Sequence, residues 1–306
     1  MLSAQVLQQE LTALTQATSA PYNVNFFCHT SPPLDVKKQT QWQQALAPYY
    51  QALGLTMDVA TSGPARLPFS HDMADVLEAF RPPVVSFHFG LPAPELLSRV
   101  KAWGSLVMSS ATTVDEAKWL AHHGADVVIA QGLEAGGHRG MFLSTELTTQ
   151  TGTFALLPQI VQAVKLPVIA AGGIATAEGV QAAITLGAQG VQIGTSYLCS
   201  HEATTSALHR AVLQSAESQH TALTNLFSGR PARGVMNRLM RELGPLSEHA
   251  PAFPLATAAV APLRAAAEAK GCHDFSPLWS GQNTVGVRVA SASDITRDFV
   301  KAWTNG

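Results

Sequence analysis

The sequence is short of charge, and this shortage excludes several classes of protein. Only 13% of its 306 residues are Asp, Glu, Lys or Arg, and the formal net charge is −2 at pH 7. A nucleic-acid surface needs clustered Lys and Arg, so we expect no nucleic-acid partner. Aromatic residues are also scarce, at 7%, but 46% of the residues are apolar, which is too many for a disordered chain. We therefore expect a folded chain with a sizeable core.

Long apolar runs and cysteine pairs are lacking as well. The longest apolar runs, such as residues 82–85, have the length of a strand and not of a membrane span, so we expect no membrane contact. Residues 1–16 have no basic n-region and no long apolar segment, which predicts no secretory signal. Cys28, Cys199 and Cys272 lie far apart and fit neither a zinc site nor a disulfide framework. They predict a reducing, cytoplasmic setting. No His, Asp or Glu group has metal-ligand spacing, so no metal is expected.

The sequence does contain a regular alternation of short apolar segments and helical segments. Five β-rich apolar segments begin at residues 84, 105, 126, 167 and 190, and an earlier candidate begins at residue 22. Near-continuous apolar runs at this spacing are typical of parallel strands that are buried on both faces. The predicted strands are residues 22–27, 84–89, 105–110, 126–130, 167–171 and 190–194.

Helical segments are predicted between and after these strands. Thr113 and Thr176 stand where N-caps are expected, and an acidic residue follows each of them in the first turn. The alternation of strand and helix predicts an α/β fold with a parallel sheet. We interpret residues 1–306 as one domain, with βα units in 1–200 and a helical cap and C-terminal segment in 201–306. The predicted helices are residues 4–18, 37–53, 113–120, 176–184, 256–270 and 293–303.

Two consecutive strand ends carry the strongest functional signal. Gly172 and Gly173 follow one strand and precede a helix, and Gly194 and Thr195 follow the next strand. Glycine lets the backbone approach a phosphate closely, and a helix N-terminus offers N–H donors. Paired phosphate-binding loops after the last two strands are a recurrent feature of barrels. The loops therefore predict a phosphate site, for a substrate or for flavin mononucleotide (FMN). Glycines that only form tight turns are the plainer alternative.

A second signal is the histidine loop, residues 131–140, with the sequence QGLEAGGHRG. It follows a strand that ends on the same face, and its four glycines surround His138 and Arg139. A histidine near its reference pKa can take or give a proton at neutral pH, so His138 is a candidate catalytic residue. A surface loop with an incidental His-Arg pair is the alternative. His88 alternates with two phenylalanines along its strand, which fits a buried core histidine as well as one that contacts a ligand.

These motifs together resemble the nitronate monooxygenase family, formerly called 2-nitropropane dioxygenases. The resemblance covers most of the chain and rests on the strings NVNFF (23–27), VSFHFGLP (85–92), EAGGHRG (134–140), AAGGI (170–174), QIGT (192–195) and DFSPLWSGQ (274–282). It implies a TIM-type (β/α) barrel that uses FMN and O₂ to oxidise alkyl nitronates, such as propionate 3-nitronate, to a carbonyl product and nitrite. It also implies a role in detoxification, with a nitronate and O₂ as small-molecule partners and a homodimer as a candidate assembly.

The resemblance further implies roles for particular residues. His138 would act as a base towards neutral nitroalkanes or as the electrostatic partner of an anionic nitronate. His88 would line the pocket, and Ser280 and Gln282 would close over the flavin ring. The implied FMN contacts are those of the phosphate loops, Gly172, Gly173, Gly194 and Thr195, and those of other strand ends and the histidine loop, Asn25, Ser109, Gln131 and Gly136.

The sequence departs from the family pattern at its beginning. In the family, a strand resembling PIIQAPM, a helix and a Gly-rich second strand precede the helix that matches residues 4–18, and none of these is present. Six strand candidates stand against the eight strands of a closed barrel. We therefore expect a barrel that lacks its first two strands, about 50 residues, through a missed upstream start or a truncation.

Two alternative functions stay open at this point. One is a related FMN barrel reductase that uses NAD(P)H to reduce a quinone or an enoyl group. The other is a truncated, non-catalytic remnant, which the missing strands suggest.

Overall fold

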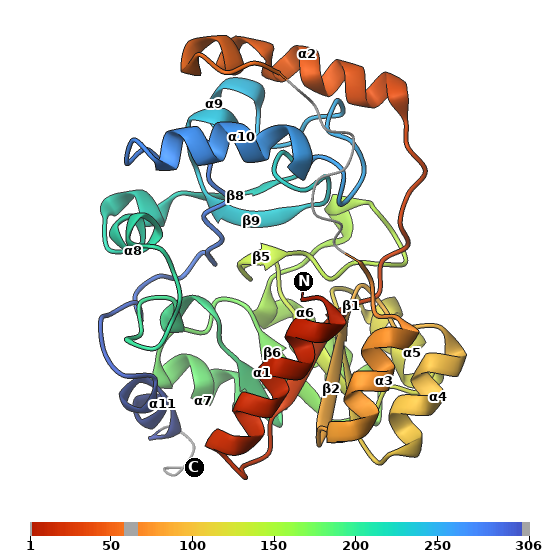
Figure 1. Cartoon of the computed structure of the whole chain (residues 1–306). Coiled ribbons are helices and arrows are strands. Elements are labelled where there is room, and N and C mark those ends of the chain that lie inside the picture. Colours follow the sequence, from red (N-terminus) through yellow and green to blue (C-terminus); the bar gives the residue numbers. More distant parts are fainter. Residues whose placement is uncertain (1, 58–66, 302–306) are drawn as a thin grey trace.

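A curled sheet of six parallel strands forms the centre of the computed structural model, which describes residues 2–57 and 67–301 (Figure 1). Neighbouring strands in the sheet are also neighbours in the chain, apart from the short β5, which belongs to another sheet. All six coincide with strands predicted from the sequence. In sheet order they are β1 (Asn23–Phe27), β2 (Val84–His88), β3 (Leu106–Ala111), β4 (Val127–Gln131), β6 (Val168–Ala171) and β7 (Gly190–Gln192).

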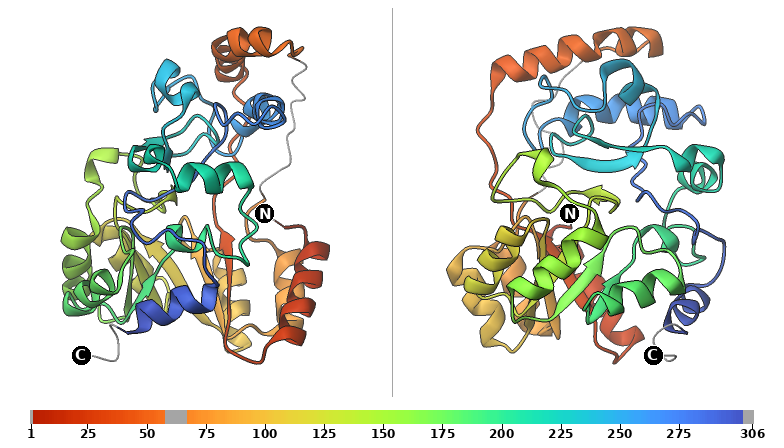
Figure 2. Two further views of the ribbon diagram at one scale, coloured as in Figure 1. Left: turned by 90° about the vertical axis from the view of Figure 1, so that its left-hand side faces the viewer. Right: turned by 180° about the vertical axis from the view of Figure 1, so that it is seen from behind.

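Helices cover the outer face of this sheet (Figure 2). Apolar side chains of the strands pack against these helices. Val85 and Phe87 of β2 are fully buried in a cluster with apolar residues of α1, α3 and α4. Val128 of β4 is buried in the same way against α5 and α6. This burial is the main stabilising contribution to the sheet. The helices are α1 (Ala4–Ala17), α3 (His71–Phe80), α4 (Pro94–Ala102), α5 (Val114–His122), α6 (Thr153–Ala163) and α7 (Ala177–Thr185).

Side-chain caps begin two of these helices where the sequence predicts them. The hydroxyl of Thr113 accepts a hydrogen bond from Glu116 N at the start of α5, and that of Thr176 accepts one from Gly179 N at the start of α7. Each cap satisfies a backbone N–H that has no partner within its own helix. The predictions of helices at 113–120 and 176–184 are thereby confirmed, as is that of α1.

The C-terminal third contains strands as well as the predicted helical cap. β8 (Thr221–Thr224) and β9 (Ala232–Val235) pair with β5 (Gly137–His138) in an antiparallel sheet of order β5-β9-β8. The expectation of a helical cap did not include these two strands. Both strands are four residues long, and β9 includes Arg233 and Gly234, so no apolar run marks them in the sequence.

The cap also receives a helix from the first quarter of the chain. In Figure 1, α2 (Val36–Leu53) lies across α10 (Thr257–Glu268), far from the strand that precedes it. Tyr50 donates its hydroxyl proton to Ala259 O at 2.7 Å, and Trp42 Nε1 donates to Ala256 O at 3.3 Å. The predicted helices at 37–53 and 256–270 thus pack together. The remaining helices of the cap are α8 (Ala207–Leu213) and α9 (Arg238–Leu243).

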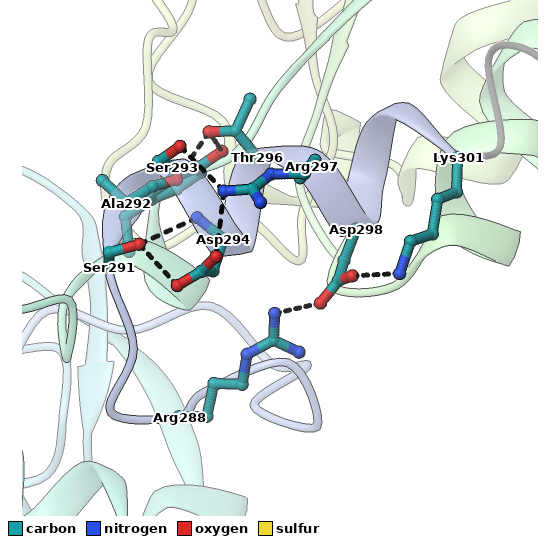
Figure 3. Close-up of polar contacts among 10 residues, drawn as sticks. Arg288, Ser291, Ala292, Ser293, Asp294, Thr296, Arg297, Asp298 and Lys301 are labelled. Carbon is teal, nitrogen blue, oxygen red and sulfur yellow. Dashed lines mark hydrogen bonds and ion pairs between the residues drawn. The ribbon is translucent and has the colours of Figure 1, made fainter.

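The last described helix, α11 (Ala292–Val300), returns to the parallel sheet. Ile295 and Phe299 are buried in a cluster with residues of α7 and β7. Its outer side carries the N-cap Ser291 and a set of surface ion pairs (Figure 3), which add little to stability individually. The prediction of a final helix is confirmed, but Trp303, where that helix was expected to end, lies outside the described residues.

Two further expectations concern cysteines and membranes. All three cysteines are free thiols. Among residues 2–57 and 67–301, no helix combines the length and the apolar character that a membrane crossing requires.

We expect Leu157→Ala to lower the free energy of unfolding by about 3 kcal/mol, because Leu157 is fully buried between α6 and the sheet and its truncation leaves a cavity. Phe154→Ala, in the same helix, is the control, since Phe154 is 75% exposed and should change that free energy by about 0.5 kcal/mol or less. Urea denaturation of both variants checks this. Equal losses would contradict the assigned core.

Candidate active site

His138 is placed at the carboxyl ends of the parallel strands by its backbone. It forms the two-residue strand β5, which pairs with Ala232 of β9. Its carbonyl oxygen accepts two side-chain hydrogen bonds, from Gln131 Nε2 at 3.0 Å and from His88 Nε2 at 3.1 Å. Gln131 also accepts from Gly140 N at 2.7 Å, so its amide holds the histidine loop at both His138 and Gly140. The histidine loop is therefore held in place by hydrogen bonds and is not a surface loop with an incidental His-Arg pair.

His88 is a partly buried, neutral imidazole. A carbonyl can only accept, so His88 Nε2 carries the proton that it donates to His138 O, and Nδ1 accepts from the Ser110 hydroxyl at 3.1 Å. Burial lowers the pKa of His88 to about 4, an effect that its hydrogen bond to His138 O opposes. His88 thus acts as a positioning residue for β5. The ring lies against Phe89 at 4.6 Å between centroids.

The imidazole of His138 points into a group of aromatic rings and onto one hydroxyl. His138 Nε2 lies 2.8 Å from Ser228 Oγ, and that hydroxyl donates to Arg230 O at 3.3 Å. A hydroxyl has one proton, so while Ser228 donates to Arg230 O it accepts from His138 Nε2–H. The surrounding rings have centroids 5.3–6.1 Å from that of His138 and are those of Phe27, Phe89, Phe253 and Trp279.

A second part of the site is a cavity of about 270 Å³ whose lining includes six glycines. Gly172 and Gly173 line it with φ angles of +115° and +72°, which favour glycine. Gly194 and Thr195 line it from the end of β7. A Cβ atom added to Gly194 would meet no other atom within 4 Å. The structure therefore brings together the two predicted phosphate loops around one hollow, which adjoins Gly136, Gly137 and Trp279.

Gly281 and Asn283 also line this cavity, which we call the glycine cavity. Gly281 N donates to Thr195 Oγ1 at 2.9 Å, and Asn283 Nδ2 donates to Gly173 O at 2.9 Å. A Cβ on Gly136 would lie 2.5 Å from Gly281 N, so only glycine permits this approach. No Asp, Glu, Lys or Arg side chain of the described residues lines the cavity. It can therefore bind an anion through N–H, amide and hydroxyl groups alone.

Four predicted site residues lie apart from the glycine cavity. Ser109 is fully buried, and its hydroxyl donates to Gly90 O at 2.8 Å and to Phe87 O at 3.2 Å. Asn25 stands on the open face of β1 and accepts from the Ser86 hydroxyl at 2.9 Å. The two others are Ser280, whose buried hydroxyl donates to Gly281 O, and Gln282, which lines a separate hollow. Their roles towards a flavin stay predictions.

Arg139 has a structural place despite its position beside His138. It is completely buried, and Nη1, Nη2 and Nε donate to Gly132 O, Gln131 O and Gln150 Oε1 at 2.6, 2.8 and 3.0 Å. Burial lowers the pKa of its guanidinium to about 10. Its bonds close the histidine loop onto the end of β4.

Sequence reasoning missed the residues that the cap contributes. Ser228 and Arg230 come from the connection between β8 and β9, and Phe253 comes from the loop before α10. The string Ser228-Gly229-Arg230 offered one signal, a glycine between two polar side chains, but nothing in it points to a histidine ninety residues away. Among the described residues no cluster of His, Cys, Asp and Glu could hold a metal ion.

The low pKa of His88 predicts a pH dependence of stability. In the unfolded chain this histidine binds a proton below its ordinary pKa of 6.5, whereas in the folded chain it binds one only below about pH 4. The free energy of unfolding is therefore unaffected by this group above pH 6.5 and falls as the pH is lowered from 6.5 towards 4. The decline is about 3 kcal/mol. Denaturant unfolding at pH 7 and pH 4.5 should show a smaller pH effect for His88→Gln than for the wild type. His122→Gln, at the exposed end of α5, controls for the loss of a histidine. Identical pH effects in wild type and His88→Gln would contradict the neutral, buried state.

Comparisons with known proteins agree with this geometry. Residues 1–302 match the model of the nitronate monooxygenase family. The nitronate monooxygenase of Pseudomonas aeruginosa is 37% identical, over 93% of this chain and 82% of its own length. A nitroalkane oxidase of Streptomyces ansochromogenes superposes with a TM-score of 0.88 at 34% identity, covering 99% of this chain and 87% of that one. FabK from Thermotoga maritima shares the fold, with a TM-score of 0.69 at 24% identity over 99% and 82% of the two chains. The chain, with its TIM-type fold and its histidine beside a glycine cavity, belongs to the nitronate monooxygenase family of oxidoreductases.

Proposed function

We propose that this chain uses FMN and O₂ to oxidise alkyl nitronates, such as propionate 3-nitronate, to a carbonyl compound and nitrite. The observation that carries the proposal is the position of His138, which is held at its carbonyl and at Nε2 directly beside the glycine cavity. The similarity to proteins named nitronate monooxygenase supports the reaction type.

The glycine cavity suits the phosphate end of FMN. Its lining includes backbone, the Thr195 hydroxyl and the amides of Gln131, Gln192 and Asn283. Three of its glycines, Gly137, Gly172 and Gly173, have positive φ angles that turn the chain tightly. Such loops bind phosphate through N–H groups and need no cationic side chain. The open space beside Gly194 leaves room for the ligand. When bound, FMN supplies the two-electron chemistry and the reaction with O₂.

The chain's own residues bind and orient the substrate and exclude water. The rings around His138 make an apolar pocket, where an N–H donor stabilises an anion more strongly than it does in water. His138 either holds the negative nitronate through a ring N–H or removes the proton from a neutral nitroalkane. Ser228 fixes the ring orientation through its contact with Nε2, and His88 stays neutral and keeps β5 in place.

Several other features remain predictions beside this proposal. They are a cytoplasmic setting, a homodimer, a role in detoxification and the organisation of residues 1–306 as a single FMN-binding domain.

We predict that His138→Ala retains FMN but oxidises propionate 3-nitronate at least 100-fold more slowly, because a positioned proton-transfer group typically contributes this much. O₂ consumption and nitrite release measure turnover, and the flavin released on denaturation measures FMN. His122→Ala, at an exposed site on α5, is the control. Turnover by His138→Ala at the wild-type rate would refute the assignment of His138.

We predict that Gly194→Leu loses bound FMN at least 10-fold without a loss of fold. The new side chain would meet no protein atom within 4 Å of its Cβ and would extend into the glycine cavity. Flavin content per chain, and thermal unfolding of the flavin-free protein, give the two readouts. Full FMN content in Gly194→Leu would show that the phosphate lies elsewhere.

A further inference from the structure

Arg230 belongs to the same short connection that holds His138. It lies two residues after Ser228, between β8 and β9. Gly229 between them has a φ angle of +89°, and a Cβ there would lie 2.1 Å from Pro251 O. The connection is thus pressed against the loop that carries Phe253, which leaves Arg230 little freedom to move away from the pocket.

The guanidinium of Arg230 stacks on a ring of the active-site pocket. Its Cζ lies 3.9 Å from the centroid of Phe89, the ring that His138 and Phe253 also contact. Phe89 itself has a φ angle of +71°, in the left-handed region that a bulky residue rarely adopts. Such strain persists where the surroundings impose it, often at functional sites. The end of β2 is therefore shaped to present this ring to both Arg230 and His138.

Most of the hydrogen-bonding capacity of Arg230 is unused among the described residues. Its one hydrogen bond there runs from Nη2 to Met141 O. By contrast, buried Arg139 engages all three of its guanidinium nitrogens. Burial lowers the pKa of Arg230 to about 10, which still leaves it cationic at neutral pH. Glu116 is the carboxylate whose charge acts on Arg230, but its oxygens are taken up by Thr112, Phe142 and Leu143.

Arg230 is half-buried, stacks on the Phe89 ring and has N–H donors that are not used by the described residues. This arrangement suits the binding of a planar anion. A guanidinium binds a carboxylate through paired N–H donors, and excluding water strengthens the contact. The nitronate group itself is assigned to His138 in the proposed function. The donors of Arg230 are then available to a second anionic group on the same substrate.

We propose that Arg230 is a specificity-determining residue that binds a carboxylate on the substrate, remote from the nitronate carbon. Propionate 3-nitronate, the example in the proposed function, carries such a carboxylate. This inference rests on the proposed function and adds the residue that would select such a substrate.

The test compares two nitronates of similar size, propionate 3-nitronate and butyl-1-nitronate, which lacks the carboxylate. In Arg230→Gln, kcat/KM for propionate 3-nitronate should fall about 30-fold relative to that for butyl-1-nitronate, mainly through KM, as expected for a lost charge-assisted bond. Because both substrates are measured on the same protein, this ratio does not depend on the active fraction. Arg230→Lys, which keeps the charge but not the paired donors, should lower the ratio about 5-fold. It also serves if Arg230→Gln is insoluble.

Two further measurements distinguish carboxylate binding by Arg230 from a general effect of the change in net charge. Arg241→Gln makes the same change in net charge at an exposed position on α9 and should leave the ratio unchanged. Calorimetric titration with butanoate, a carboxylate without a nitro group, should show binding to the wild type that Arg230→Gln weakens. A ratio within about 2-fold of wild type, or equal losses on both substrates, would overturn the inference. If the wild type oxidises neither nitronate, the proposed function fails, and butanoate binding still tests Arg230 by itself.

Discussion

The structure of the site depends on how one two-residue strand is held. β5 leaves the end of β4, pairs with β9 of the cap, and has its last carbonyl clamped by Gln131 and His88. The two sheets share no strand, so the side chains of Gln131 in β4 and His88 in β2 join β5 to the parallel sheet. Because His138 is the end of that strand, the same bonds that join the two sheets also orient the candidate catalytic residue. His88 supports β5 as a neutral imidazole, and the burial of its ring lowers its pKa.

The two halves of the site can bind negative charge in different ways. The glycine cavity is lined by backbone and by uncharged side chains, among them one hydroxyl and three amides, so it can bind a phosphate without a cation. The pocket around His138 is aromatic and contains a guanidinium, and there a negative charge is attracted in surroundings that contain little water. Gly137 and Trp279 lie where the two halves meet. A substrate in one half would thus lie beside a cofactor anchored in the other.

The sequence predicts the sheet and the glycine loops well but not the cap. The six strands are short apolar segments with helices between them, so the strand pattern and the helix pattern predict the same fold. The clustering of Gly172, Gly173 and Gly194 follows from their shared edge of the sheet. β8 and β9 carry no such pattern, because they are only four residues long and β9 is fixed by its pairing with the distant β5 as well as with β8. Ser228 and Arg230 were missed for the same reason. Ser109 has a polar side chain at a strand end, but its alternation turns the hydroxyl to the backbone.

The central claim is that a nitronate, and not NAD(P)H, gives up electrons beside His138. Its most direct test is to mix the FMN-loaded protein with propionate 3-nitronate, and separately with NADH, in the absence of O₂ and to follow the visible absorbance of the flavin. The account predicts rapid loss of that absorbance with the nitronate and none with NADH on the same timescale. Rapid loss with NADH and none with the nitronate would contradict it and would identify a reductase.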